Sequence, residues 1–388
     1  MTGPMVLAAR HVRHNPARSL IIAVCVAAAC AIPMLVRVLV RDFQRSLVTR
    51  AQATPVVIGS KGNRFDLTLA LLYFRRVETD AISFADFQQL STNRGGTWIP
   101  VHVRFTTRGR PLVATSPDYF EHRRLRPAAG TLPLVLGDAV LGARLARELG
   151  LGVGDTLFSD QREVFDISKP QALKMHVVGV LAPSGEPDDE AVFTDTKTAW
   201  ILEGLSHAHV DPNKAPEKVV MEKDPGRIVL SEALIDYNEV TPENVGAFHL
   251  HADDAHLPLS GIIFVPDSVK SGTLITSRLN SGKTLQAAVP LSVVDDLLAY
   301  VFRLRALIDG ISLVLGLLTS LLVGLVTALS IRIRSRELET LRRIGVSRGT
   351  IAAMFSWEIV LLLGSGAILA VVGVAVITIS APDLIRWL

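Results

Sequence analysis

Three long runs without a charged residue constrain this chain more than any other feature of its sequence. They cover residues 19–36, 310–331 and 359–380. A helix needs about 20 apolar residues to cross a bilayer, so each run is predicted to form a transmembrane helix. The hydrophobic content of 49% and the mean hydropathy of +0.37 agree, because both are too high for an ordinary soluble enzyme of 388 residues.

The first run could instead belong to a cleaved secretion signal. Arginines precede its apolar core at positions 10, 13 and 18, and AAAC at 27–30 weakly resembles a processing site. A membrane helix is favoured because apolar residues continue past the run at a four-residue spacing, at Leu35, Leu39, Phe43 and Leu47. Pro33 lies inside the run, where membrane helices tolerate proline.

The arginines predict which segments face the cytoplasm. Between the second and third runs lie Arg332, Arg334, Arg336, Arg342, Arg343 and Arg348, against Arg303 and Arg305 before the second run. Cytoplasmic loops are rich in Lys and Arg, so residues 332–358 and the N-terminus are predicted inside, and residues 42–305 and the C-terminus outside. Arg37, Arg41, Arg45 and Arg50 oppose this order, but long domains translocate largely regardless of charge. The net charge of +3 accompanies no nucleic-acid motif, so no nucleic-acid partner is expected.

We expect an α+β membrane protein, with three transmembrane helices and a large mixed α/β extracytoplasmic domain of two subdomains on helical stalks. The predicted segments are a cytoplasmic N-terminus (1–18), transmembrane helices (19–36, 306–331 and 359–380), the extracytoplasmic domain with its stalks (37–305), a cytoplasmic segment (332–358) and an outer tail (381–388). Cys25 and Cys30 both lie in the first run, so the outer domain must fold without a disulfide. Within it, residues 139–155 are predicted to hold a helix with Leu141, Leu145 and Leu149 on one face, ended by glycines.

A second periodic pattern begins before the second run. Apolar residues alternate steps of three and four at Val294, Leu297, Val301, Leu304, Ile308, Ile311, Leu315, Leu318 and Leu322. This predicts one continuous stalk helix that packs on a neighbour. Gly316, Ser320 and Gly324 recur every four residues, a spacing typical of close helix packing, although glycine is also simply common in membrane helices.

The cytoplasmic segment reads as two helices. Leu338, Leu341 and Ile344 form the apolar stripe of a short amphipathic helix that Gly345 ends, and Ser347 is a plausible N-cap for the helix that follows. A carboxylate entering the membrane is costly unless paired, so Glu358 is expected to pair with a cytoplasmic arginine or cap the preceding turn; the alternative is that it reaches water. Asp309, four residues after Arg305, is expected to form a local ion pair.

Residues 334–363, RSRELETLRRIGVSRGTIAAMFSWEIVLLL, resemble the cytoplasmic segment of MacB/FtsX/LolC-type (type VII) ABC transporter permeases. The matching positions are Arg334, Glu337, Leu341, Arg342, Gly345, Ser347, Ile351 and Glu358. GARLARELGLGVGDTL (142–157), VVGVLAPSGEPDDEAVFTD (177–195) and AARHVRHNPARSLI (8–21) resemble the outer domain and the basic entry of the same permeases. The family normally has four spans, so the resemblance implies that its fourth helix is absent from this sequence.

The resemblance implies a mechanism without catalytic residues in this chain. A separate ATPase, with its own ATP and Mg, would dock in trans under the cytoplasmic segment, and a second permease copy, identical or related, would complete the assembly. The implied coupling residues are Glu337, Leu338, Leu341, Arg342, Arg343, Ile344, Gly345, Arg348 and Glu358. Leu338, Leu341 and Ile344 would anchor the helix, and Arg342, Arg343 and Arg348 would face the ATPase or lipid headgroups. SGKT at 281–284 lacks the earlier glycine of a phosphate loop, so no cofactor is expected here.

A different chemistry is open at HLHADDAH (249–256). In a strand, His249 and His251 share one face, and Asp253, Asp254 or His256 could complete a zinc site. Surface histidines near acidic loops are usually just solvated, so metal-linked transport is the minority interpretation.

The preferred function is the permease subunit of an ABC transporter in the cell inner membrane, which exports or extracts a hydrophobic or envelope-associated substrate. The alternative is an FtsX-like mechanotransmitter that regulates an envelope protein at its outer domain. A membrane enzyme is disfavoured, because the sequence contains no nucleophile elbow, zinc-helix signature or glycine-rich cofactor loop.

Overall fold

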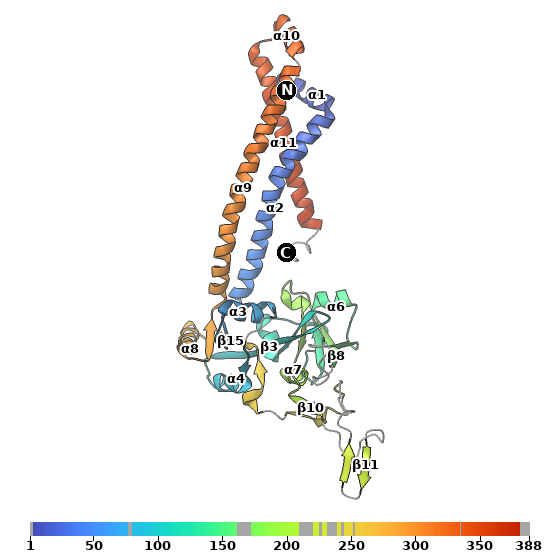
Figure 1. Cartoon of the computed structure of the whole chain (residues 1–388), viewed down its shortest axis with the longest axis vertical. Helices are drawn as coiled ribbons and strands as arrows, with labels where there is room; N and C mark the ends of the chain where they lie inside the picture. The colour runs from blue at the N-terminus through green and yellow to red at the C-terminus, as the bar shows by residue number, and fades with distance from the viewer. Residues whose placement is uncertain are drawn as a thin grey trace. The chain divides into compact units, whose positions relative to one another are not determined.

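The computed structural model describes residues 3–76, 80–160, 172–208, 220–224, 227–230, 239–241, 244–250, 253–333 and 335–380. It divides into two compact units, which are described separately (Figure 1). The helical unit comprises Met1–Ser46 and Leu297–Leu388, and the α/β unit comprises Leu47–Asp296.

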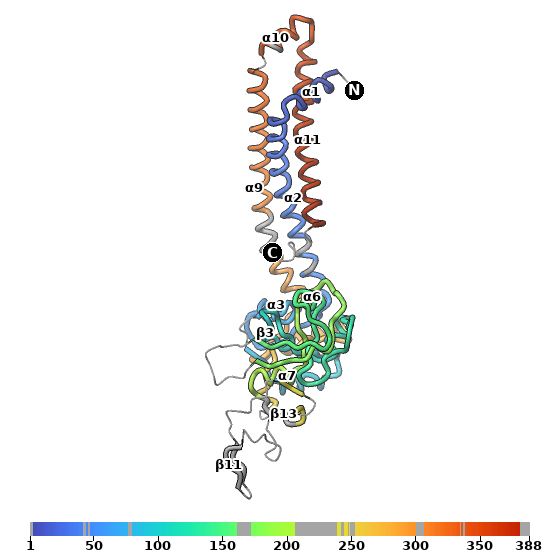
Figure 2. The backbone as a smooth tube through the Cα atoms, turned by 90° about the vertical axis from the view of Figure 1, so that its right-hand side faces the viewer, coloured from blue at the N-terminus to red at the C-terminus, as the bar shows by residue number. Residues whose placement is uncertain are grey.

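The helical unit is built from five helices in its described part. These are α1 (Gly3–His14), α2 (Pro16–Gln52), α9 (Pro290–Ile333), α10 (Ser335–Arg343) and α11 (Arg348–Ser380). Figure 2 shows α2, α9 and α11 side by side. Three segments are long and apolar enough to cross a membrane, Pro16–Arg41, Ala306–Ile333 and Arg348–Ser380, which confirms the three candidate spans. Pro33 lies inside α2 without ending it.

The three long helices meet along a narrow stripe. Ile22 and Val26 of α2 pack with Val323 of α9 and Leu362 of α11. Helices α2 and α11 approach closely at Gly366 of α11, where a Cβ atom would lie 2.6 Å from Val26 Cβ and 2.8 Å from the Ala23 carbonyl oxygen. Most other apolar side chains of these helices point outward, as expected for helices surrounded by lipid.

The predicted stalk seam and small-residue face do not form this contact. Ile311, Leu315, Leu318 and Leu322 are exposed, and a Cβ atom at Gly316 or Gly324 would meet no described atom within 4 Å. Ser320 donates a hydrogen bond to the Gly316 carbonyl of its own helix. Packing of a neighbouring helix on these residues therefore stays a prediction. Asp309, expected to pair locally, accepts a 2.8 Å hydrogen bond from Arg37 of α2.

The α/β unit is centred on a mixed sheet with ten strands among the described residues. In order the strands are β16 (Leu285–Ala288), β1 (Val56–Ser60), β15 (Gly261–Pro266), β3 (Gly96–Thr107), β4 (Arg110–Thr115), β9 (Val192–Thr194), β6 (Asp138–Leu141), β8 (Lys174–Leu181) and β5 (Pro127–Gly130), with β7 (Thr156–Phe158) pairing beside β8. The pairs β4–β9 and β6–β8 are parallel and the other pairs are antiparallel.

Short helices and small β pairs surround this sheet. The helices are α3 (Arg64–Tyr73), α4 (Phe84–Ser91), α5 (Pro117–Arg123), α6 (Ala143–Leu149), α7 (Thr196–Leu202), α8 (Val269–Ser281) and the 3-10 turns η1 (Pro187–Glu190), η3 (Val245–Ala247) and η4 (Asp254–His256). The small pairs are β2 (Ile82–Ser83) with β14 (Pro258–Leu259), β10 (Ser206–Ala208) with β13 (Phe248–Leu250), and β11 (Val220–Asp224) with β12 (Arg227–Leu230).

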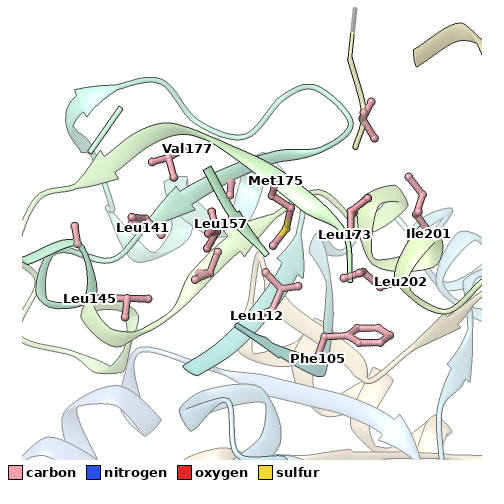
Figure 3. Packing of buried hydrophobic residues seen from close by; sticks show 14 residues of the cluster. Phe105, Leu112, Leu141, Leu145, Leu157, Leu173, Met175, Val177, Ile201 and Leu202 are labelled. Atoms are coloured by element: carbon pink, nitrogen blue, oxygen red, sulfur yellow. The ribbon is translucent and has the colours of Figure 1, made fainter. Parts of the chain in front are cut away.

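Among the described residues of the α/β unit, buried hydrophobic side chains form two clusters, here called cores, beside further buried residues. One core gathers Met175 and Val177 of β8, which alternate with more exposed residues along the strand, around Leu112, Leu141 and Leu157 (Figure 3). The other packs Trp98, Phe264 and Trp200 with their neighbours. Strand β3 contributes Phe105 to the first core and Trp98 to the second, so one continuous sheet joins the two cores.

The helix predicted over residues 139–155 is wrong at its start. Residues Asp138–Leu141 form strand β6, and α6 begins only at Ala143. Strand β6 lies between β8 and β9, with Ala139, Val140 and Leu141 fully buried. A strand buried on both faces gives a continuous apolar run, which periodicity cannot distinguish from a buried helix. The helix ends as predicted, at Gly150 in the left-handed conformation.

Candidate functional site

The segment between the second and third spans forms a helix docked on its own bundle. Leu338 of α10 is buried against Ile351, Met354 and Phe355 of α11 and against Ala8 of α1, with Leu341 half-buried beside them. Helix α1 was not expected from the sequence, and its fully buried Ala8 is its contact in this cluster. The packing ties α10 to two other helices, so it is not a free loop.

The opposite face of this segment is open. Ile344 is 73% exposed, and Arg336, Arg342, Arg343 and Arg348, which precede and follow it in the sequence, are exposed as well. Arg343 pairs with Glu339 one turn earlier at 2.8 Å, an exposed pair of little energetic worth. Gly345, at φ +94°, ends α10, and Ser347 accepts a hydrogen bond from Thr350 N at the start of α11. The side chain of Glu337 and the whole of Arg334 lie outside the described residues.

Of the three predicted anchors, Leu338 and Leu341 therefore pack inward and Ile344 points outward. An isoleucine exposed among arginines is an apolar contact with a basic rim, which suits a protein partner with an acidic surface. The prediction that these residues contact an ATPase remains untested, and Ile344 is its strongest candidate.

Glu358 lies at a polar junction of the bundle. Its side chain is 4% exposed, and Arg18 of α2 donates a 3.3 Å hydrogen bond to Oε1. His11 of α1 lies 3.6 Å from the same oxygen, and Arg18 also donates to Ser330 Oγ of α9 at 2.7 Å. The junction therefore connects α1, α2, α9 and α11, and the arginine that pairs with Glu358 comes from the start of the first span.

A second buried charge cluster lies in the α/β unit, at the last turn of α2. Arg50 is 1% exposed. It donates from Nε to the Leu72 carbonyl, and from one terminal nitrogen to the carboxylates of Glu186 and Asp188. Its other terminal nitrogen lies 3.3 Å from the Tyr119 hydroxyl, which in turn donates to Asp188 at 2.6 Å. We call Arg50, Tyr119, Glu186 and Asp188 the Arg50 cluster.

The electrostatics of this cluster favour its charged form. Burial alone would raise the pKa of Asp188, but the Arg50 charge and the hydrogen bonds from Arg50 and Tyr119 outweigh burial and hold that pKa below 3.8. Burial likewise opposes the charge on Arg50, yet Tyr119, Asp188 and Glu186 raise its pKa. Burial raises the pKa of Tyr73, whose ring is 6.0 Å from the Arg50 guanidinium, to about 12. Arg50 and Asp188 are therefore both ionised at neutral pH.

The loop of residues 184–190 connects the Arg50 cluster to the rest of the unit. Asp188 belongs to the cluster, while Asp189 accepts from the backbone of Ser184 and Gly185 at 2.8 Å. Glu190 accepts from Arg110 and Arg144, each at 3.0 Å, and both arginines also pair with Glu148. The consecutive acidic residues Asp188, Asp189 and Glu190 thus bind three different sets of donors.

Gly142 makes this loop position possible. A Cβ atom there would lie 2.2 Å from the Asp188 carbonyl oxygen and 2.5 Å from the Asp189 carbonyl carbon. The two outer-domain stretches that resemble the permeases, 142–157 and 177–195, therefore meet at this contact. Arg50 entered the sequence argument only as a topology arginine, and no local pattern identified Asp188 or Tyr119 as its partners.

The structure describes only part of the predicted zinc site. His256 lies in η4 and is exposed, His249 is opposite His207 in the register of β10 and β13, and His251 lies outside the described residues. Among the residues that can be described, no three His, Cys, Asp or Glu side chains form a possible metal site. Zinc binding stays a prediction.

The model of the MacB-like periplasmic core domain family matches residues 19–222, just over half of the chain. Among proteins with curated descriptions, none matches.

The solved structures that are similar to this chain include the following two. The periplasmic region of MacB from Actinobacillus actinomycetemcomitans is 12% identical, with a TM-score of 0.36 over 65% of this chain and 97% of that one. The extracellular domain of the noncanonic ABC-type transporter YknZ from Gram-positive bacteria is 9% identical, with a TM-score of 0.33 over 60% of this chain and 98% of that one. These scores are low, so the family assignment rests on the domain match.

Proposed function

This chain belongs to the MacB/FtsX-type family of ABC transporter permeases, as a membrane protein with a MacB-like extracytoplasmic domain, and we propose that it couples ATP hydrolysis by a separate ATPase to motion of that domain. The substrate class we propose is hydrophobic or envelope-associated, moved outward or extracted at the inner membrane. We assign ATP hydrolysis and its Mg to the partner subunit and no catalytic step to this chain.

The observation that supports the proposal is that α10 has one packed face and one exposed face. A coupling element must be fixed to the moving helices on one face and open to a partner on the other. Leu338 and Ala8 fix α10 to α11 and α1, while Ile344 and the surrounding arginines remain exposed. An isolated helix this short would be marginal in water, so its order depends on that packing.

The proposed orientation follows from the same residues. The exposed arginines around Ile344 favour the cytoplasmic side, where the ATPase would bind. The polar junction at Glu358 then lies at the same end of the bundle, because Glu358 follows Phe355 of the α10 contact by three residues on α11. Displacement of α10 would therefore act on all three long helices.

The experiment is capture of the partner by the full-length chain. Tagged chain is purified from native membranes in mild detergent, and co-purifying ATPases are quantified by mass spectrometry. Ile344→Asp places a charge at the centre of the proposed contact and is expected to reduce ATPase recovery at least about tenfold, the equivalent of roughly 1.4 kcal/mol.

Val269→Asp is the matched control, because Val269 is also an exposed apolar residue, 87% exposed on α8 of the α/β unit. Its ATPase recovery is expected to equal that of the wild type. The proposal fails if the wild-type chain recovers no ATPase, or if Ile344→Asp recovers as much as Val269→Asp.

A further inference from the structure

The end of α2 makes several side-chain hydrogen bonds with the α/β unit, in addition to the contacts that end a helix. Tyr73 of α3 donates to the Leu47 carbonyl at 3.2 Å, and Arg50 donates to the Leu72 carbonyl at the end of α3. Arg123 of α5 donates to Thr54 Oγ1 at 2.6 Å, and Thr54 donates back to the Arg50 carbonyl. Together with the carboxylates of Glu186 and Asp188, these hydrogen bonds connect the end of α2 to α3, to α5 and to the 184–190 loop.

The contact between Arg50 and the two carboxylates is ionic, although an apolar contact could stabilise this turn equally well. Replacing a buried ion pair by well-packed apolar residues is often neutral or stabilising, because burying two charges costs several kcal/mol of desolvation. Arg50 and Asp188 are each 1% exposed, so this cost is present in full. The guanidinium group makes the contact directional, because its planar set of N–H donors holds each acceptor at a fixed angle.

The acceptors are themselves fixed. Asp188 accepts a hydrogen bond from the Tyr119 hydroxyl. Its neighbour Asp189 accepts from the backbone at residues 184–185, and Glu190 accepts from Arg110 and Arg144. A displacement of Arg50 therefore cannot be absorbed by a loose side chain. It moves the 184–190 loop, and with it strand β9 that follows at Val192.

We propose that Arg50, Asp188 and Tyr119 form a fixed joint, which makes the last turn of α2 part of the α/β core and passes movement of α2 into the 184–190 loop. The proposal rests on the proposed function, since it names the point where that movement enters the outer domain. Helix α2 is uninterrupted from Pro16 to Gln52, so the joint sits on the same helix as the first span. Arg50 is a positioning residue and contacts no substrate.

The test uses the full-length chain with its co-purified ATPase in lipid nanodiscs. Hydrogen exchange is measured by mass spectrometry with and without ATP, for peptides covering the 184–190 loop. Arg50→Met/Asp188→Leu removes both charges together, so that no buried charge is left without a partner. We expect the ATP-dependent change in this loop to be lost in the double variant, while ATPase recovery and ATPase rate stay at wild-type values.

Lys174→Met/Glu239→Leu is the matched control. It removes another ion pair of the α/β unit, 2.9 Å long, that involves neither α2 nor the 184–190 loop. The ATP-dependent change in exchange is expected to persist in this variant. A purely structural role of the Arg50 cluster would alter exchange equally with and without ATP, and would leave the difference between the two unchanged.

The outcomes separate the joint from the function. If no ATPase co-purifies, the proposed function fails and the joint fails with it. If the ATPase co-purifies but ATP changes nothing in the wild-type loop, the joint alone is refuted. If the loop of the double variant responds to ATP as the wild type does, the joint is refuted and the function stands. If the double variant loses protection throughout the α/β unit, Tyr119→Phe replaces it. That change removes one hydroxyl, and a wild-type ATP response would then refute the joint.

Discussion

Arg50 and Asp188 form an ion pair in which each side chain is 1% exposed, although 138 positions separate them in the sequence. A buried pair of this kind is costly to break, because the remaining charge is left without water or a partner; losing one member typically costs about 3–5 kcal/mol. The pair therefore makes the stability of the α/β unit depend on the charge state of Asp188.

Asp188→Asn is expected to lower the free energy of unfolding of the α/β unit by about 3 kcal/mol at neutral pH, because the amide keeps the shape of the carboxyl group but not its charge. The folded-state pKa of Asp188 lies below its unfolded value of 3.8, so near that pH the unfolded chain binds more protons. The contribution of Asp188 is thus complete above about pH 5, and it is lost as pH falls through the folded pKa. The difference between wild type and variant should shrink below about pH 4.

The measurement is urea unfolding followed by tryptophan fluorescence, in a Trp357→Phe/Trp387→Phe background that leaves the buried Trp98 and Trp200 of the α/β unit as reporters. Burial raises the pKa of Asp195, which acts in the opposite direction, since its contribution is lost as pH rises through the folded pKa. Asp195 is present in both proteins and cancels in the difference. A difference that stays constant down to about pH 2 would contradict the assignment.

Arg18→Ala is expected to destabilise the helical unit more than Glu358→Ala does. Without Arg18, the carboxylate of Glu358 stays buried, 4% exposed, with His11 at 3.6 Å; without Glu358, Arg18 is 28% exposed and can reach water. The excess cost is about 1–3 kcal/mol, the penalty for a buried polar group without its partner. Thermal unfolding in detergent measures it, and the Arg18→Ala/Glu358→Ala variant should recover part of the Arg18→Ala loss. Equal losses in the two single variants would show that Glu358 is hydrated.

The elements that sequence reasoning identified are those whose signal is local. The spans follow from hydropathy along one segment, and α10 follows from the spacing of Leu338 and Leu341, with Gly345 directly after it. The need of Glu358 for a partner follows from the cost of a charge near lipid. None of these steps requires knowledge of distant residues.

The partners themselves could not be predicted in this way. Arg18 and Glu358 are 340 positions apart, so the sequence shows that a partner is needed and not which arginine supplies it. Arg50 resembles the other arginines that follow the first span, and only the fold brings it to Asp188. Strand β6 was taken for helix because it is buried on both faces, with Ala139, Val140 and Leu141 0% exposed, and that burial is set by residues far along the chain.

Gly142→Ala is expected to destabilise the α/β unit by about 1–3 kcal/mol, the usual cost of forcing atoms into a packed site. The new methyl group would lie 2.2 Å from the Asp188 carbonyl oxygen, so the backbone of η1 must move. Gly142 has φ −63° and ψ 149°, which alanine adopts freely, so the effect is steric. Gly152→Ala is the control, because no described atom lies within 4 Å of a Cβ atom there. The urea midpoint measures both, and equal midpoints would mean that η1 yields without cost.

Gly366→Ala tests the contact between α2 and α11 against Gly364→Ala. Both glycines lie inside α11, where alanine improves helix propensity by about 1 kcal/mol, so this gain cancels in the comparison. A Cβ atom at Gly364 would meet no described atom within 4 Å, whereas one at Gly366 would lie 2.6 Å from Val26 Cβ. Gly366→Ala is therefore expected to be less stable than Gly364→Ala by about 1–3 kcal/mol in thermal unfolding in detergent.

Val26→Ala combined with Gly366→Ala decides whether the cost comes from this contact. Trimming Val26 removes Cγ1, which lies 2.7 Å from the new Cβ position, so the double variant should recover part of the Gly366→Ala loss. Recovery should remain incomplete, because Val26 Cβ at 2.6 Å and the Ala23 carbonyl oxygen at 2.8 Å stay in place. Equal stability of the Gly364→Ala and Gly366→Ala variants would mean that α2 and α11 do not approach each other at Gly366 in the membrane.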